Sequence, residues 1–271
     1  MKATSPICIP GYAQSGIGGN RQPADDDAMG IFLRRPSTHL FIAVSLVLVG
    51  IKLLFVFYRG DFPGRDQAAA FTWTLIGSII ALGLAGLFAD RAAGLPDPFS
   101  DMDRERRGAL WATGLGTFYG LVTIAMYVRH PTGSPLGNGS GWDHMALPWS
   151  IPFYMFGAIF LEFLLRLAAL CILFWSVHVV VLRRRLRLTT FWITAAVVAL
   201  YEIWPYMAPD VHAHRWDRVA LSALEPLYLS NVLEAGLLLR YGWFLPIVFR
   251  LAFYLVWHIL FGGLAGPYFG H

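Results

Sequence analysis

The chain has 271 residues, of which 56% are hydrophobic and only 14% are charged. Soluble domains carry about 25% charged residues, so this composition excludes a soluble globular protein. The net charge of +4 is modest, and the basic residues are spread over short segments rather than one patch, so we expect no nucleic acid as a partner.

The first segment, residues 1–36, is rich in Gly, Pro, Ser and Asp and has no apolar periodicity. Such a segment is typical of a flexible tail or of one that a partner orders. It contains no apolar core followed by a small-residue cleavage site, so we expect no cleaved signal peptide. The remainder, residues 37–271, is predicted to be a transmembrane helical domain.

Seven apolar stretches follow, and a transmembrane helix needs about 20 mostly apolar residues. The fourth stretch is the longest, so it must tilt or begin in the membrane interface. The sequence therefore predicts an all-α, multi-pass transmembrane helical bundle with about seven spans and membrane lipids as its surroundings. The stretches lie at about 39–58, 68–88, 109–128, 152–182, 188–207, 219–239 and 243–264.

The basic residues predict the orientation of these spans. With the N-terminus inside, the inner segments hold most of the loop Lys and Arg, including the runs Arg104–Arg107 and Arg183–Arg187. Inner loops of membrane proteins carry this excess of positive charge. We therefore expect an inner (cytoplasmic) membrane protein with a cytoplasmic N-terminus and an outer C-terminus.

Small residues also recur at four-residue spacing, at Gly116 and Gly120 and at Gly77 and Ala81. This spacing lets membrane helices approach closely, and we expect it to serve ordinary helix packing here.

Several polar side chains fall within the predicted spans. Such groups are costly at bilayer depth and normally face the bundle interior in pairs, although Lys52 can extend its charge outward. Helix rise places Arg166, Glu202 and His258 at similar depths, roughly 21–25 Å from the inner end. A packing network, a catalytic site and a transport site all remain open. The residues are Lys52, Glu162, Arg166, His178, Glu202, Arg250 and His258.

Spacing favours two groupings among these side chains. Glu162 and Arg166 are four residues apart on one helix and can pair directly. Arg250, Tyr254 and His258 repeat at the same spacing and share one face of the last span. Two carboxylates and two guanidiniums would make a formally neutral set.

Residues 150–265 resemble the CPBP family, the intramembrane proteases related to the type II CAAX prenyl protease. In the stretch Gly157–Arg166, Glu162 and Arg166 match the second glutamate and the arginine of the family's first motif, and Leu161 replaces its first glutamate. In Ala199–Pro205, Trp204 stands where the second motif has histidine.

The third motif of the family departs further. Arg250 takes the place of its histidine and Tyr254 that of its Asn or Asp. Arginine stays protonated and cannot act as a general base, so the resemblance implies a degenerate member that lacks most of the water-activating groups. We expect a structural or accessory subunit of a membrane protein complex. The alternative is an intramembrane endopeptidase that uses Glu162, Glu202 and His258, with Arg166 as their partner.

No residue spacing assigns a metal or a cofactor. His212 and His214 with nearby carboxylates form a weak metal pattern, and exposed loop histidines are common. His178 or His258 could each ligate a pigment or haem as a neutral imidazole, and this remains open.

Overall fold

A computed structural model describes residues 34–58, 69, 71–129, 147–214, 216 and 226–263. The chain divides into two units, and every helix given below belongs to the second, Pro36–His271. The tail predicted over residues 1–36 lies almost entirely outside the described residues. The described residues form helices and turns and include no strand, which confirms the predicted all-α fold.

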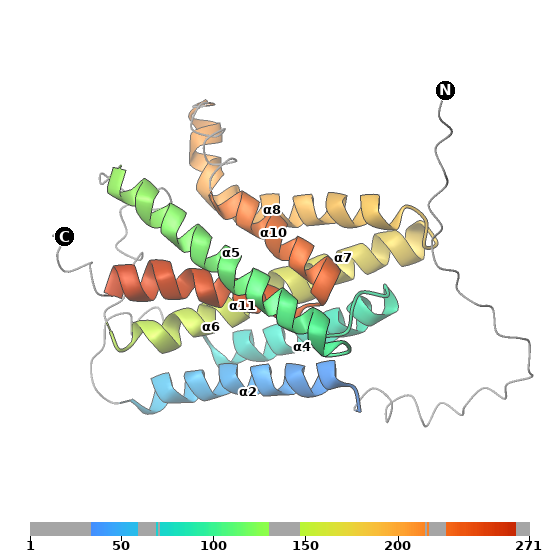
Figure 1. The fold of residues 1–271 in the computed structure, drawn as a ribbon, viewed down its shortest axis with the longest axis horizontal. Helices are drawn as coiled ribbons and strands as arrows, with labels where there is room; N and C mark the ends of the chain where they lie inside the picture. Colours follow the sequence, from blue (N-terminus) through green and yellow to red (C-terminus); the bar gives the residue numbers. More distant parts are fainter. Residues whose placement is uncertain are drawn as a thin grey trace, which may run out of the picture. The chain divides into compact units, whose positions relative to one another are not determined.

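Seven helices follow one another along the described part of the chain, each at a predicted place (Figure 1). Two of them contain π-helical segments, named η. The helices are α2 (Pro36–Phe57), α4 (Trp73–Ala92), α5 (Met102–Arg129), the composite helix α6–η1–α7–η2 (Ser150–Glu162, Phe163–Leu170, Cys171–Trp175 and Ser176–Val181), α8 (Arg187–His212), α10 (Pro226–Tyr241) and the composite helix α11–η3 (Phe244–Tyr254 and Leu255–Gly262).

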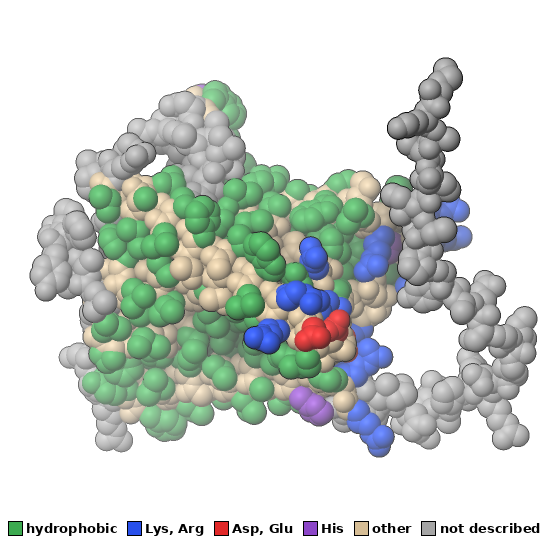
Figure 2. All heavy atoms as spheres, viewed as in Figure 1, with side chains coloured by type: hydrophobic (Ala, Val, Ile, Leu, Met, Phe, Trp, Pro, Cys, Tyr) green, Lys and Arg blue, Asp and Glu red, His purple; other side chains and the backbone are tan. Residues whose placement is uncertain are grey.

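Six of these helices are long and apolar enough to cross a membrane. The seventh, α10, has 16 residues, which is short for a span. The fourth helix runs from Ser150 to Val181 over 32 residues, as its long apolar stretch predicts. Hydrophobic side chains cover most of the face shown in Figure 2, as a lipid-facing surface requires. The protein is therefore a multi-pass helical membrane bundle.

The turns at one end of the bundle are tied together by arginines. Arg91, at the end of α4, donates hydrogen bonds to the hydroxyls of Ser37 (2.6 Å) and Thr38 (2.7 Å) at the start of α2. Arg184 and Arg187 donate to the carbonyls of Ala92 and Gly94, which joins the turn before α8 to the turn after α4. Figure 2 shows Lys and Arg side chains gathered at one end of the visible face. The structure thus brings together several of the arginines that belong to the predicted inner segments.

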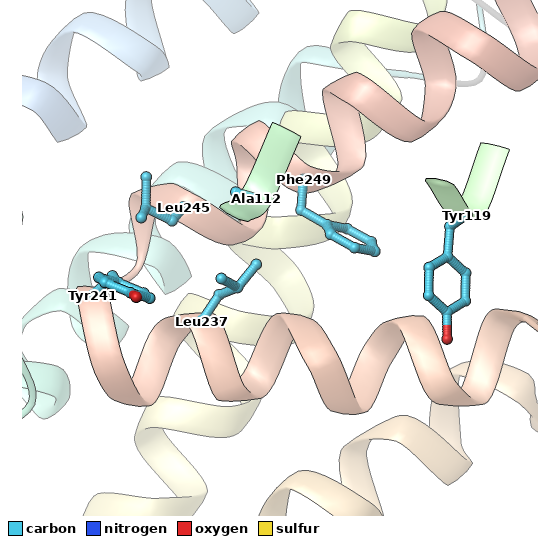
Figure 3. Packing of buried hydrophobic residues seen from close by; sticks show 6 residues of the cluster. All are labelled: Ala112, Tyr119, Leu237, Tyr241, Leu245 and Phe249. Carbon is cyan, nitrogen blue, oxygen red and sulfur yellow. The ribbon is translucent and has the colours of Figure 1, made fainter. Parts of the chain in front are cut away.

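Helix α11 packs along α5, and α10 closes the same core (Figure 1). The cluster in Figure 3 takes one aliphatic and one aromatic side chain from each of these three helices. All its members are less than a tenth exposed, so they lie inside the bundle rather than against lipid. They are Ala112, Tyr119, Leu237, Tyr241, Leu245 and Phe249.

Glycines permit the closest helix approaches. A Cβ atom at Gly86 would overlap the carbonyl of Leu167 on η1, and one at Gly116 would overlap that of Phe249 on α11. A Cβ atom at Gly120 would overlap the side chain of Val256 on η3. The close approach predicted from Gly116 and Gly120 is therefore present between α5 and the last helix.

The expectation for Gly77 is wrong. In the described part of the chain no atom lies within 4 Å of its Cβ position, so this glycine makes no close helix contact. Lys52 is buried, with 7% of its surface exposed.

Substitution of two of the α4 glycines tests this packing. Gly86→Ala is expected to lower the free energy of unfolding by about 1–3 kcal/mol, because the added methyl meets backbone that cannot move aside. Gly77→Ala is the control, and it should be neutral or stabilise by up to about 1 kcal/mol, because helical glycine costs entropy. Thermal unfolding in detergent measures both, and equal losses would contradict the proposed contact.

Candidate functional site: a buried charge network

Six polar residues from four helices meet inside the bundle, and we call them the charge network. Glu162 is the last residue of α6, and Arg166 lies one turn further on η1. Glu202 comes from α8 and Arg250 from α11, while α10 supplies two more side chains. The members are Glu162, Arg166, Glu202, Asn231, Glu234 and Arg250.

Arg250 is bonded to all three carboxylates of the network. Its Nε donates to Oε1 of Glu162 at 2.5 Å, and its Nη1 donates to Oε1 of Glu202 at 3.1 Å. Its Nη2 donates to Oε2 of Glu234 at 2.8 Å, with the Oδ1 atom of Asn231 3.4 Å away. One guanidinium thus links α11 to α6, α8 and α10, because its donors form a rigid planar fork.

Arg166 makes a second set of contacts with the same groups. Its Nη2 donates to Oε2 of Glu234 at 2.5 Å and also to Oδ1 of Asn231. Oε2 of Glu162 lies 3.7 Å from Arg166 Nε, and Oε2 of Glu202 lies 3.8 Å from Arg166 Nη2. Glu234 is therefore shared by both guanidiniums, while Glu162 and Glu202 are held mainly by Arg250.

Burial makes these pairs energetically decisive. Arg166, Glu162 and Glu234 are each 1% exposed, and Arg250 is 4% exposed. An isolated charge at such depth costs several kcal/mol, and it is tolerated only when partners surround it. Each member therefore depends on the others for its place inside the bundle.

Sequence reasoning found four members of the network and missed two. The structure joins Glu162, Arg166, Glu202 and Arg250. Glu234 lies inside the sixth predicted span, so the sequence could have indicated it as a further buried charge in an apolar segment. Asn231 is three residues before it, a spacing that puts both side chains on one helix face.

Glu234 changes the charge of the site. The predicted set of two carboxylates and two guanidiniums is wrong, because the structure brings three carboxylates against the two guanidiniums. If all the groups are ionised, the network carries one negative charge.

His258 lies among aromatic rings. It stacks on Tyr154 of α6 at 4.1 Å between ring centroids and meets Tyr254 edge-on at 4.9 Å. Tyr254 in turn lies near Arg250, which is four residues earlier on the same helix. His258 therefore adjoins the charge network through Tyr254.

The other two positions aligned with the CPBP motifs contribute no bond to the network in the described structure. Trp204 is 52% exposed, so the side chain in the place of the family's second-motif histidine faces the outside of the bundle. Leu161 is partly exposed beside the buried Glu162. The side chain of Leu161 offers no hydrogen-bonding group.

His178 occupies a structural position at the end of η2. It is 3% exposed and stacks on Phe174 with ring centroids 5.0 Å apart. Its Nδ1 lies 3.2 Å from the carbonyl oxygen of Arg185, which can only accept, so Nδ1–H is the donor. This bond ties the helix end to the turn that leads into α8.

No protein-family model, curated protein or solved structure matches this chain. The CPBP resemblance therefore stays a prediction from the motif residues. The fold and the site together define a class of protein, an all-α membrane bundle with a buried charge network.

Removing Arg250 should weaken the bundle strongly. Arg250→Gln is expected to cost about 3–5 kcal/mol, because three buried carboxylates would be left with one guanidinium. Arg250→Lys should recover only part of this loss, since a single ammonium cannot bond three carboxylates in different directions.

The matched control is Arg107→Gln, at an exposed position near the start of α5. It should change stability by less than about 0.5 kcal/mol. Thermal unfolding in detergent compares the three variants, and similar midpoints for R250Q and R107Q would contradict the role given to Arg250.

Proposed function

We propose that this chain is a non-catalytic, CPBP-like integral membrane protein that acts as a structural or accessory subunit of a membrane protein complex. The observation that carries the proposal is the binding of all three network carboxylates by Arg250. In the CPBP family a histidine stands at this position. Here a permanent cation replaces it, and the network becomes a tie between helices.

The chemistry of the site supports this reading. A general base needs a free lone pair within about 3 Å of the proton it removes, and its proton affinity must suit the task. Oε1 of Glu162 and Oε1 of Glu202 are engaged by Arg250, and a neighbouring guanidinium favours the ionised, weakly basic carboxylate. His258 stacks on Tyr154 and meets Tyr254 edge-on.

One observation favours a second candidate, an intramembrane endopeptidase that uses Glu162, Glu202 and His258. The π-helical segments η1 and η3 begin directly after Glu162 and Tyr254, and η3 carries His258. Such segments are rare and occur frequently at functional sites.

Cleavage and assembly assays separate the two candidates. Purified protein in lipid vesicles is incubated with a prenylated peptide that ends in a CAAX sequence, beside the variant Glu162→Gln. We expect no turnover in either sample. Turnover that is present in the wild type and lost in the variant would establish the endopeptidase and overturn the proposal.

The accessory role has its own test. The tagged chain, extracted from its native membrane in mild detergent, should elute with other membrane subunits at fixed stoichiometry. A solitary, stable chain at every expression level would contradict the proposed role.

The proposed location is the inner (cytoplasmic) membrane, with the N-terminus in the cytoplasm and the C-terminus outside. The arginines that tie the turns at one end of the bundle support this orientation, because positive charge gathers on the cytoplasmic side.

Cysteine labelling tests the orientation. Cys8 and Cys171 are first replaced by serine, and single cysteines are then introduced by Ser100→Cys or Ser134→Cys. Residue 100 is in the turn after α4, and residue 134 is in the predicted outer segment after α5. A membrane-impermeant maleimide on intact cells should label Ser134→Cys and should reach Ser100→Cys only after permeabilisation. The reverse pattern would contradict the orientation.

A further inference from the structure

The turn that leads from η2 into α8 lies at one end of the bundle (Figure 1) and carries a concentration of positive charge. Four of the five residues from 183 to 187 are arginines, and all four are exposed. The sequence has no Asp or Glu between Glu162 and Glu202, so no acidic residue is close to them along the chain. We call this segment the arginine turn. Its basic residues are Arg183, Arg184, Arg185 and Arg187.

Two of the arginines hold the turn against the end of α4. Nη2 of Arg184 donates to the carbonyl oxygen of Ala92 at 3.2 Å, and Nη2 of Arg187 donates to that of Gly94 at 2.8 Å. A carbonyl oxygen carries only a partial charge, so these bonds place the two guanidiniums without neutralising them. The arginine turn therefore presents its positive charge at a fixed place on the end of the bundle.

The other two arginines have no bonding partner inside the described fold. Within the part of the chain that the structure describes, the side chains of Arg183 and Arg185 make no hydrogen bond and no ion pair. The backbone suits glycine better than arginine, since φ is 48° at Arg183 and 66° at Arg184, in the left-handed region. The turn therefore carries exposed cations at positions where the backbone disfavours a side chain.

Exposed apolar side chains alternate with these cations. Leu186 is 67% exposed, Leu188 is 60% exposed, and Val181, which precedes the turn, is 69% exposed. The turn follows the spanning helix Ser150–Val181 and leads into the span Arg187–Pro205, which places it at the edge of the apolar layer. The surroundings that match it are apolar beside the leucines and anionic beside the arginines.

We propose that the arginine turn binds the phosphate headgroup of an anionic phospholipid. Arg183 and Arg185 donate to the phosphate oxygens, while Arg184 and Arg187 hold the turn in place. Guanidinium groups match phosphate well, because two parallel N–H groups can bond two oxygens at once. Leu186 contacts the first part of the acyl chains. Groups of four or more basic residues beside a transmembrane helix attract anionic lipids in this way.

A membrane lipid fits this surface better than a soluble anion or an acidic protein. A free phosphate ion would satisfy the arginines but would leave Leu186 and Leu188 in water. A protein partner would have to displace lipid, because spanning helices lead into the turn and out of it. An anionic phospholipid supplies the negative charge and the apolar contact together.

Lipid binding to the full chain in detergent micelles tests the proposal. Native mass spectrometry measures the affinity for phosphatidylglycerol and for phosphatidylcholine with the same acyl chains, and the wild type should prefer phosphatidylglycerol. Arg183→Gln combined with Arg185→Gln should weaken phosphatidylglycerol binding by roughly 10–30-fold and leave phosphatidylcholine binding unchanged. The matched control is Arg106→Gln combined with Arg107→Gln. It removes the same charge from exposed positions near the start of α5 and should weaken binding by less than about 3-fold.

Thermal unfolding gives a second readout and shows whether the variant is folded. In phosphatidylcholine the midpoint of the Arg183→Gln, Arg185→Gln variant should lie within about 2 °C of the wild type, because the described fold gives these side chains no bond. Added phosphatidylglycerol should raise the wild-type midpoint and leave that of the variant unchanged. Sodium chloride should reduce this increase, because salt screens exposed charges.

Several results would overturn the proposal. The wild type could show no preference for phosphatidylglycerol, or the Arg106→Gln, Arg107→Gln control could lose as much affinity, which would indicate a diffuse attraction to the whole basic end. Displacement of phosphatidylglycerol by inorganic phosphate would indicate a site for a soluble anion. A lowered midpoint of the Arg183→Gln, Arg185→Gln variant in phosphatidylcholine would assign these side chains to the fold. Loss of co-eluting subunits with unchanged lipid binding would assign the surface to a protein partner.

Discussion

The contact of Arg250 with three carboxylates is the constraint on which the rest of this structure depends. Each carboxylate comes from a different helix, so a single planar guanidinium fixes the relative positions of α6, α8, α10 and α11. Inside a membrane, apolar side chains gain little from meeting each other rather than lipid. Directional bonds between buried charges therefore specify which helices meet and at what height.

The rest of the bundle is arranged around that contact. Gly116 and Gly120 bring α5 against the last helix, which carries Arg250, and Gly86 brings α4 against η1, which carries Arg166. The arginines at the turns tie the ends of α2, α4 and α8. Small residues thus determine the distances between helices, and the buried charged residues determine which helices are neighbours.

Much of the fold could be predicted from the sequence, because an apolar run of sufficient length has one stable form in a bilayer. The site could be predicted only in part. The spacing of Glu162 and Arg166 along one helix can be recognised in the sequence. The contact of α10 with the other helices depends on tertiary structure, so the role of Glu234 was missed. Gly77 was misjudged for the same reason, since a repeat of small residues in one helix does not reveal which face meets a neighbour.

A double-mutant cycle between Arg250 and Glu162 tests the central claim most directly. The stabilities of Arg250→Gln, Glu162→Gln and the double variant, each measured by unfolding in detergent, give the coupling between α11 and α6. For side chains in direct contact we predict a coupling of about 1–3 kcal/mol, with the double variant less destabilised than the sum of the single ones. Additive losses, within about 0.5 kcal/mol, would show that the two side chains do not hold these helices together.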